Sequence, residues 1–159
     1  MDHPDPQRSD LDRLTELGRQ QALNTGRRMS SVPVNAVISA PEQRCRDTAL
    51  AITLYRPFPM LASVDGSLTS KAYETETPQQ RASRGVAAVN RFLGATSGDV
   101  VVVSHGHLVE LMAAKLTGVA LSGDVLKREM VNAGVKHMRL DTKSGLWSLV
   151  ASDATVYDD

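Results

Sequence analysis

The residues best suited to chemistry in this chain are His105 and its neighbours in Ser104-His105-Gly106-His107. They follow four valines, Val100–Val103, and precede apolar residues at helical spacing. A histidine is therefore expected where a strand ends and a helix begins, which is where ligands bind in open α/β sheets. Free amides at the start of such a helix favour an anion such as phosphate. The same pattern fits a polar residue that only caps an ordinary helix, and the local sequence supports both interpretations equally.

Strand-like and helix-like segments alternate along most of the chain, and they must position this histidine. Strands are predicted at 34–39, 60–64 and 100–103, the last one buried on both faces because it has no polar side. Helices are predicted over 15–29, from Pro41, from the capping box at 77–80, and after residue 105. An antiparallel hairpin is predicted at 134–140 and 146–151. The expected fold is α/β, with a mainly parallel sheet, helices on both faces and the hairpin as an antiparallel edge.

Size and composition restrict the class of protein. The 159 residues suit a single domain, 1–159, with an irregular lead-in at 1–13 and a polar tail at 153–159. Lys+Arg and Asp+Glu both number 18, so bulk charge does not favour a nucleic-acid partner. There is neither a run of about 20 apolar residues for a membrane span nor a secretory signal, so we expect a cytoplasmic protein without a membrane partner. Cys45 is the only cysteine, which excludes an intrachain disulfide.

Three stretches carry a resemblance to a known family. The first is Leu14-Thr15-Glu16-Leu17-Gly18, and the second is Ser39-Ala40-Pro41-Glu42-Gln43-Arg44 followed by Thr48-Ala49. The third is Ser104-His105-Gly106. In this order and spacing they resemble the histidine phosphatase superfamily, which has the phosphoglycerate-mutase-like fold. The resemblance extends over residues 14–151.

The resemblance implies hydrolysis of a small phosphomonoester through a phosphohistidine, with neither a metal nor another cofactor. It makes Arg44 a clamp on the phosphoryl oxygens and His105 the second histidine of the pocket, with the backbone N–H of His107 facing the same anion. The cationic cluster then supplies the charge neutralisation that a metal ion supplies elsewhere. Glu74 and Glu76 are the candidate proton donors, and each also fits a solvated loop carboxylate.

The sequence departs from the family at its start. The family's nucleophilic histidine lies in an Arg-His-Gly motif at the end of a central first strand, but no such motif occurs here, and His3 stands in an unrelated context. Without that strand, Val100–Val103 would have unpaired backbone groups. The lead-in could fill the gap, or neighbouring strands could close up or pair with another copy as a homodimer. We favour a third expectation, in which the natural protein begins upstream.

Two functions follow from the resemblance. The first is a phosphatase, and we favour it over a mutase because the chain lacks the long insertions of the mutases. The alternative is a catalytically inactive relative that binds a phosphorylated ligand or a protein partner, because Arg44 and His105 are only half of the expected pocket. A generic nucleotide-binding domain has little support, since neither G-x-G-x-x-G nor G-x-x-x-x-G-K-[ST] occurs.

Overall fold

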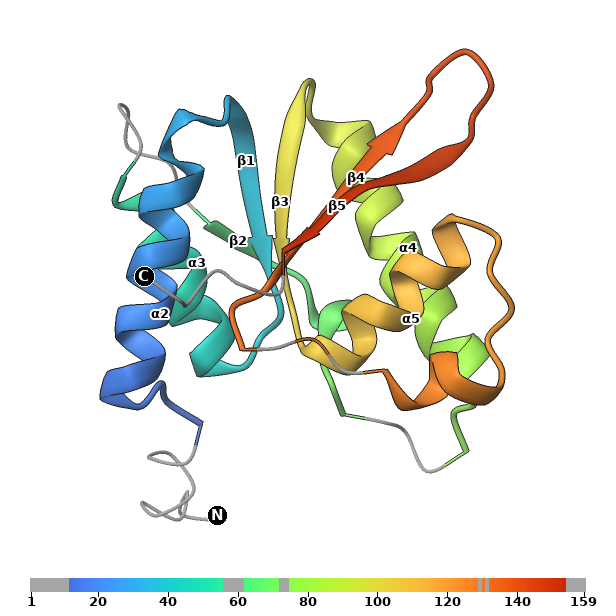
Figure 1. The fold of residues 1–159 in the computed structure, drawn as a ribbon, viewed down its shortest axis with the longest axis horizontal. Coiled ribbons are helices and arrows are strands. Elements are labelled where there is room, and N and C mark those ends of the chain that lie inside the picture. Colours follow the sequence, from blue (N-terminus) through green and yellow to red (C-terminus); the bar gives the residue numbers. More distant parts are fainter. Residues whose placement is uncertain (1–11, 56–61, 72–74, 129, 131, 154–159) are drawn as a thin grey trace, which may run out of the picture.

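The computed structural model describes residues 12–55, 62–71, 75–128, 130 and 132–153. At its centre lies a parallel sheet of three strands in the order β2-β1-β3. These strands are β2 (Ala62–Val64), β1 (Val34–Ser39) and β3 (Asp99–Val103). Helices flank the sheet on two sides, with α2 (Glu16–Arg28) and α3 (Gln43–Thr53) on one side and α4 (Pro78–Ala95) and α5 (Gly106–Leu116) on the other (Figure 1). The predicted α/β class is confirmed.

Local capping explains where the helices begin. The capping box is confirmed at the start of α4, where the Thr77 hydroxyl and the Gln80 side chain each accept a backbone N–H of the other residue. Helix α3 begins at Gln43, two residues later than the expected start at Pro41. There the Gln43 N–H donates to the Asp12 carboxylate at 2.9 Å, so a distant side chain satisfies an amide of the first turn.

The C-terminal hairpin is confirmed, but its expected place in the main sheet is wrong. Strands β4 (Val135–Leu140) and β5 (Trp147–Asp153) pair antiparallel and form a separate two-stranded sheet among the described residues (Figure 1). The two strands follow one another closely along the chain, so each pairs with the other along one edge through the turn at 141–146 and the pair forms locally. Three short 3₁₀ helices connect other elements: η1 (Met29–Ser31), η2 (Gly66–Leu68) and η3 (Gly123–Lys127).

The core lies where the helices cover the sheet. It contains Val37 and Ile38 of β1, Val103 of β3 and side chains of the covering helices and η2, namely Cys45, Ala49, Ile52, Leu68, Ala88, Val89, Leu108 and Met112. Gly85 allows α4 and α5 to approach closely, because a Cβ there would lie 2.5 Å from the Met112 sulfur. This packing fixes α5, and therefore the histidine at its start.

Strand β3 forms one edge of the parallel sheet as described. It pairs with β1, with Val101 opposite Val37, and no strand in the described ranges lies along its other edge. Val103 is buried, whereas Val100–Val102 are only partly buried. The expectation of a strand buried on both faces therefore holds for Val103 alone. The open edge explains the difference, because a strand with one neighbour is covered less than a central strand.

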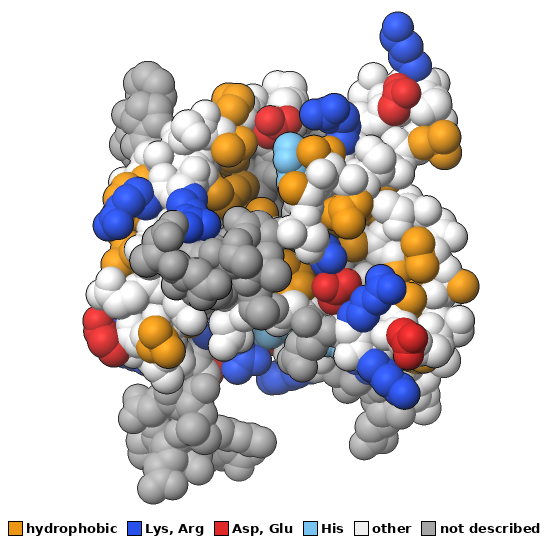
Figure 2. Space-filling view, viewed as in Figure 1, with side chains coloured by type: hydrophobic (Ala, Val, Ile, Leu, Met, Phe, Trp, Pro, Cys, Tyr) orange, Lys and Arg blue, Asp and Glu red, His pale blue; other side chains and the backbone are white. Residues whose placement is uncertain are grey.

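The surface carries mixed charges. Acidic and basic side chains are interspersed on the face shown in Figure 2, with apolar side chains between them. None of the helices in the described part of the chain is both long and apolar enough to cross a membrane.

Candidate functional site

The carboxyl ends of β1 and β3 bring the second and third sequence motifs together. Ser39 pairs with Val103, and the Ala40 N–H donates to the Val103 carbonyl at 2.8 Å. Because the two strands are parallel, the segments that follow them leave the sheet at the same edge. The start of α3 and the start of α5 therefore lie side by side.

Arg44 and His105 are in contact at this edge. Arg44 is an exposed residue in the first turn of α3, and His105 is the N-cap of α5. The guanidinium NH2 lies 3.3 Å from His105 Nδ1. A guanidinium has only donors, so Nδ1 accepts and the ring hydrogen is on Nε2. The family resemblance implies that these two residues share a pocket, and the structure places them within hydrogen-bond distance.

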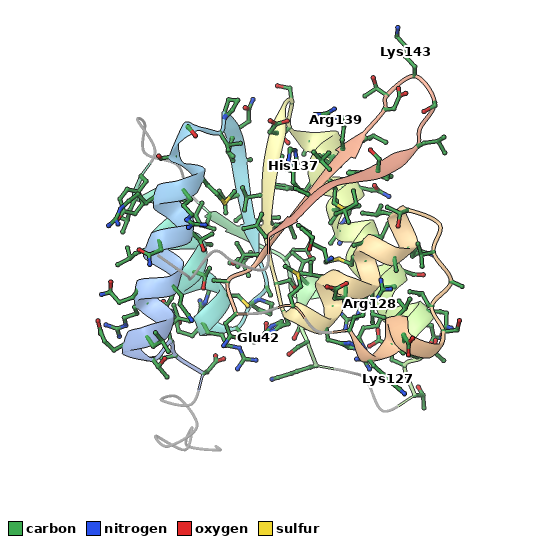
Figure 3. The ribbon with its side chains drawn as sticks, viewed as in Figure 1. Glu42, Lys127, Arg128, His137, Arg139 and Lys143 are labelled. Atoms are coloured by element: carbon green, nitrogen blue, oxygen red, sulfur yellow. The ribbon has the colours of Figure 1, made fainter. Side chains whose placement is uncertain are left out.

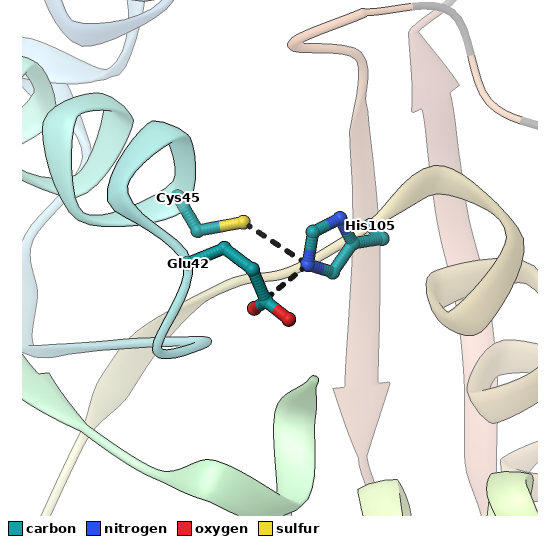
Figure 4. Close-up of side chains that lie close together, drawn as sticks. All are labelled: Glu42, Cys45 and His105. Carbon is teal, nitrogen blue, oxygen red and sulfur yellow. Dashed lines mark hydrogen bonds and ion pairs between the residues drawn. The ribbon is translucent and has the colours of Figure 1, made fainter. Parts of the chain in front are cut away.

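The Glu42 carboxylate contacts the other ring nitrogen of His105, Nε2. Its Oε2 lies 3.0 Å from His105 Nε2 (Figure 4; Glu42 is also labelled in Figure 3). The Thr69 hydroxyl donates to its Oε1. The Glu42 and His105 side chains are only 10% and 12% exposed. Burial opposes ionisation of Glu42, but the hydrogen bonds from Thr69 and His105 outweigh it and hold the pKa of the carboxyl below its usual value. A carboxylate is therefore in place on the pocket histidine.

Cys45 is buried and contacts His105 on the side that faces the core. Its Sγ lies 3.5 Å from His105 Nε2 (Figure 4) and, on its other side, 3.7 Å from the Ser104 carbonyl. Burial, reinforced by the nearby Glu42 charge, raises the pKa of the Cys45 thiol to about 12. The residue is a protonated core thiol and not an activated nucleophile.

We expect Cys45 to resist alkylation in the folded protein, because a buried thiol with this pKa forms almost no thiolate near neutral pH. Iodoacetamide labelling followed by mass spectrometry should show slow modification of the native chain and fast modification in denaturant. Equal rates in the two states would contradict the buried, protonated assignment.

The same three residues raise the question of a metal ion. Glu42, Cys45 and His105 offer ligand atoms within 4.8 Å of one another, and these are ligand types that zinc prefers. A metal on Nε2 would move the ring hydrogen to Nδ1, where it would face the donors of Arg44. The Cys45 thiol would also have to release its proton on binding. The contact of Arg44 with Nδ1 therefore disfavours a metal ion on His105.

His107 contributes through its backbone. Helix α5 begins at Gly106, so the His107 N–H belongs to the first turn, whose amides have no carbonyl one turn earlier. Its ring turns toward the segment after η3, where Nδ1 lies 3.2 Å from the Arg128 carbonyl. Gly106 allows this segment to pass closely, since a Cβ there would lie 3.1 Å from Met130 backbone atoms.

Of the two candidate proton donors, the structure describes only Glu76. Glu74, like His3, lies outside the described residues. Glu76 is nearly buried, and both of its oxygens bind Arg84, at 2.7 Å to Nε and 3.2 Å to NH2. Arg84 also donates to the carbonyls of Ser67 and Thr69. Glu76 therefore holds the arginine that anchors the Thr69 segment, and its role as a proton donor stays a prediction.

Sequence reasoning did not single out Glu42 or Thr69 as site residues. Glu42 stands two positions ahead of Arg44 at a helix start, which is an ordinary place for an acidic cap. Thr69 belongs to a predicted polar loop, at the place where the family resemblance implies a glutamate that this sequence lacks. The only sequence signal was the position of Glu42 within the Arg44 motif. Its contact with His105 depends on the pairing of β1 with β3.

Comparison with solved structures finds the same fold in other proteins, a phosphatase among them. The native mycobacterial glucosyl-3-phosphoglycerate phosphatase is similar with a TM-score of 0.74 and 19% identity, covering 90% of this chain and 87% of that one. The complex of that enzyme with inorganic phosphate has a TM-score of 0.75 at 19% identity, covering 91% and 88%. Bacillus stearothermophilus YhfR has a TM-score of 0.71 at 19% identity, covering 86% and 82%. The TM-scores show a shared fold, and at 19% identity the likeness shows the fold alone.

Comparison at the level of sequence identifies the family. No curated protein matched the chain. The family model described as histidine phosphatase superfamily (branch 1) matches residues 6–68 and 59–153, which together span most of the chain. The matched ranges include Arg44, His105 and the helices that carry them. The chain therefore belongs to the histidine phosphatase superfamily, branch 1.

Proposed function

We propose that this protein holds the phosphoryl group of a small phosphomonoester between Arg44 and His105 and hydrolyses the ester in the manner of a histidine phosphatase. The observation that carries the proposal is the 3.3 Å contact of the Arg44 guanidinium with His105 at the carboxyl edge of the parallel sheet. A guanidinium matches phosphate oxygens in a bidentate geometry. The solved mycobacterial relative in complex with inorganic phosphate supports an anion as the ligand.

Each residue has a defined part in the proposed site. Arg44 binds phosphoryl oxygens, His105 donates its Nε2 hydrogen to them, and the His107 amide adds a donor from the start of α5. Lys127 and Arg128 are exposed and lie at the same end of the molecule as Glu42 (Figure 3). They are therefore suited to contact the part of a small substrate that lies beyond its phosphoryl group. Phosphoryl transfer also needs a nucleophile, and the sequence has no Arg-His-Gly motif to supply one.

The alternative function is binding of a phosphorylated ligand or protein partner without turnover. It is supported by Arg44, His105 and the first amides of α5, which are sufficient to hold an anion without a chemical step.

One experiment separates the two functions. The full chain is incubated with 4-nitrophenyl phosphate, while release of nitrophenol and acid-labile phosphate on the protein are measured, and inorganic phosphate binding is measured by calorimetry. Turnover with acid-labile phosphate supports the hydrolase. Saturable phosphate binding without turnover supports the binding function. The absence of both overturns the proposed site.

A further inference from the structure

His105 already contacts an anionic side chain of the protein itself, the Glu42 carboxylate. His105 has one ring hydrogen, on Nε2, because Nδ1 faces the donors of Arg44. That hydrogen points toward the Glu42 carboxylate, whose Oε2 lies 3.0 Å from Nε2 (Figure 4). Thr69 holds the second oxygen of Glu42, so the carboxylate is fixed in place and nearly buried. The side chain therefore occupies the donor that a phosphoryl oxygen would use.

The charges around Glu42 oppose a second anion at this position. Helix α3 contributes Arg44 and the protonated Cys45, the β3–α5 junction contributes His105, and Asp12 adds another carboxylate at the start of α3. Arg44 is thus the permanent cation among these neighbours. A phosphoryl dianion on Arg44 and His105 would lie against the Glu42 carboxylate, and like charges at such a distance strongly disfavour joint ionisation.

We propose that Glu42 couples anion binding to proton uptake: a dianion takes over the Nε2 hydrogen of His105, and Glu42 takes up one proton from solvent as the dianion binds. This inference rests on the proposed phosphoryl site at Arg44 and His105. No bond to phosphorus or sulfur forms or breaks in this step. The neutral carboxyl group can still accept from Thr69, and it gains an O–H that can donate to the bound anion.

The direction of the pH dependence follows from the two states of Glu42. Hydrogen bonds from Thr69 and His105 keep it ionised in the free protein, despite its burial. The neighbouring dianion raises the pKa of the same carboxyl in the complex. Between these two pKa values, binding takes up one proton, so affinity falls by up to about tenfold for each pH unit of increase. Below the lower value Glu42 is already protonated, and the dependence disappears.

Sulfate is a suitable probe because it remains a dianion over the whole range of the experiment. Binding to the full chain is measured by calorimetry between about pH 5 and 8, in two buffers of different protonation enthalpy, which counts the protons taken up. We expect the natural chain to take up close to one proton near neutral pH. Glu42→Gln keeps the size of the side chain and one of its two acceptor oxygens, but it has no charge. It should take up about one proton fewer than the natural chain, bind with a shallower pH profile, and bind at least about tenfold more tightly at about pH 7.5.

Asp12→Asn is the matched control, since it removes a carboxylate from the start of α3 without touching His105. It should retain the proton uptake. Thr69→Val is a second test, because losing the hydroxyl donor weakens Glu42 as a competing anion and should tighten sulfate binding.

The inference is overturned if Glu42→Gln and the natural chain take up the same number of protons. Failure of all variants to bind sulfate, Glu42→Gln included, overturns the proposed phosphoryl site and this inference with it. Binding that survives Arg44→Ala unchanged overturns the site alone if the proton uptake still depends on Glu42.

Discussion

Alanine at Arg44 is expected to weaken inorganic phosphate binding about 100-fold, equivalent to about 2.8 kcal/mol. The guanidinium is the cation in contact with His105, and its bonds to phosphate are charge-assisted and bidentate. The exposed position of Arg44 in the first turn of α3 means that its removal should leave the fold intact. Calorimetric titration with phosphate, alongside circular dichroism of both proteins, measures the effect.

Arg46→Ala provides the comparison within the same helix. Arg46 is also exposed and also carries a positive charge, but its NH2 donates to the Gln43 side chain at 2.6 Å. Its removal changes the net charge equally, so we expect a loss of affinity below about threefold. Similar losses for Arg44→Ala and Arg46→Ala would show that phosphate responds only to general charge, which would contradict the assigned pocket.

Arg84→Met is expected to lower the free energy of unfolding by about 3 kcal/mol. The change leaves the nearly buried Glu76 without its bidentate partner, and it removes donors from the carbonyls of Ser67, Thr69 and Lys71. Methionine retains much of the apolar length of the side chain, so the loss reports mainly on the polar contacts. Chemical denaturation followed by circular dichroism gives the change in midpoint and in slope.

Arg91→Met tests the same argument on the same helix. Arg91 also reaches the η2 segment, through Asp65 and Ser67, but its side chain is 58% exposed. Exposed ion pairs contribute little, so the expected loss is below about 1 kcal/mol. If both substitutions have equally small effects, the buried Arg84–Glu76 pair does not anchor the Thr69 segment as described.

Elements with strong local signals could be predicted from the sequence. Strand β1 has the predicted bounds, Val34–Ser39, and the Thr77 capping box is formed as expected. Both signals depend on residues within a few positions of one another, so the rest of the fold does not alter them. The hairpin was also predicted, but its separation from the main sheet depends on which strands are available at a distance.

The site was only partly predictable for the same reason. The family resemblance brought Arg44 and His105 together, and their contact is present in the structure. The position of Glu42 on His105 was not predicted, because it arises from the parallel register of β1 and β3. The later start of α3 likewise depends on Asp12, which lies far from Gln43 along the chain. Contacts of this kind have no signature in a local pattern.

The register of the sheet also governs how fast the chain can fold. Pairing Val37 with Val101 joins β1 and β3 across a segment that contains α3, β2 and α4, whereas β1 and β2 are joined by α3 alone. Closing the longer loop costs entropy before its contacts contribute, so we expect β3 to join late. Until it does, the run Val100–Val103 is apolar, uncharged and rich in strand propensity, which makes it a site for intermolecular pairing. The yield of refolded protein should therefore fall with rising protein concentration, because aggregation competes with the joining of β3.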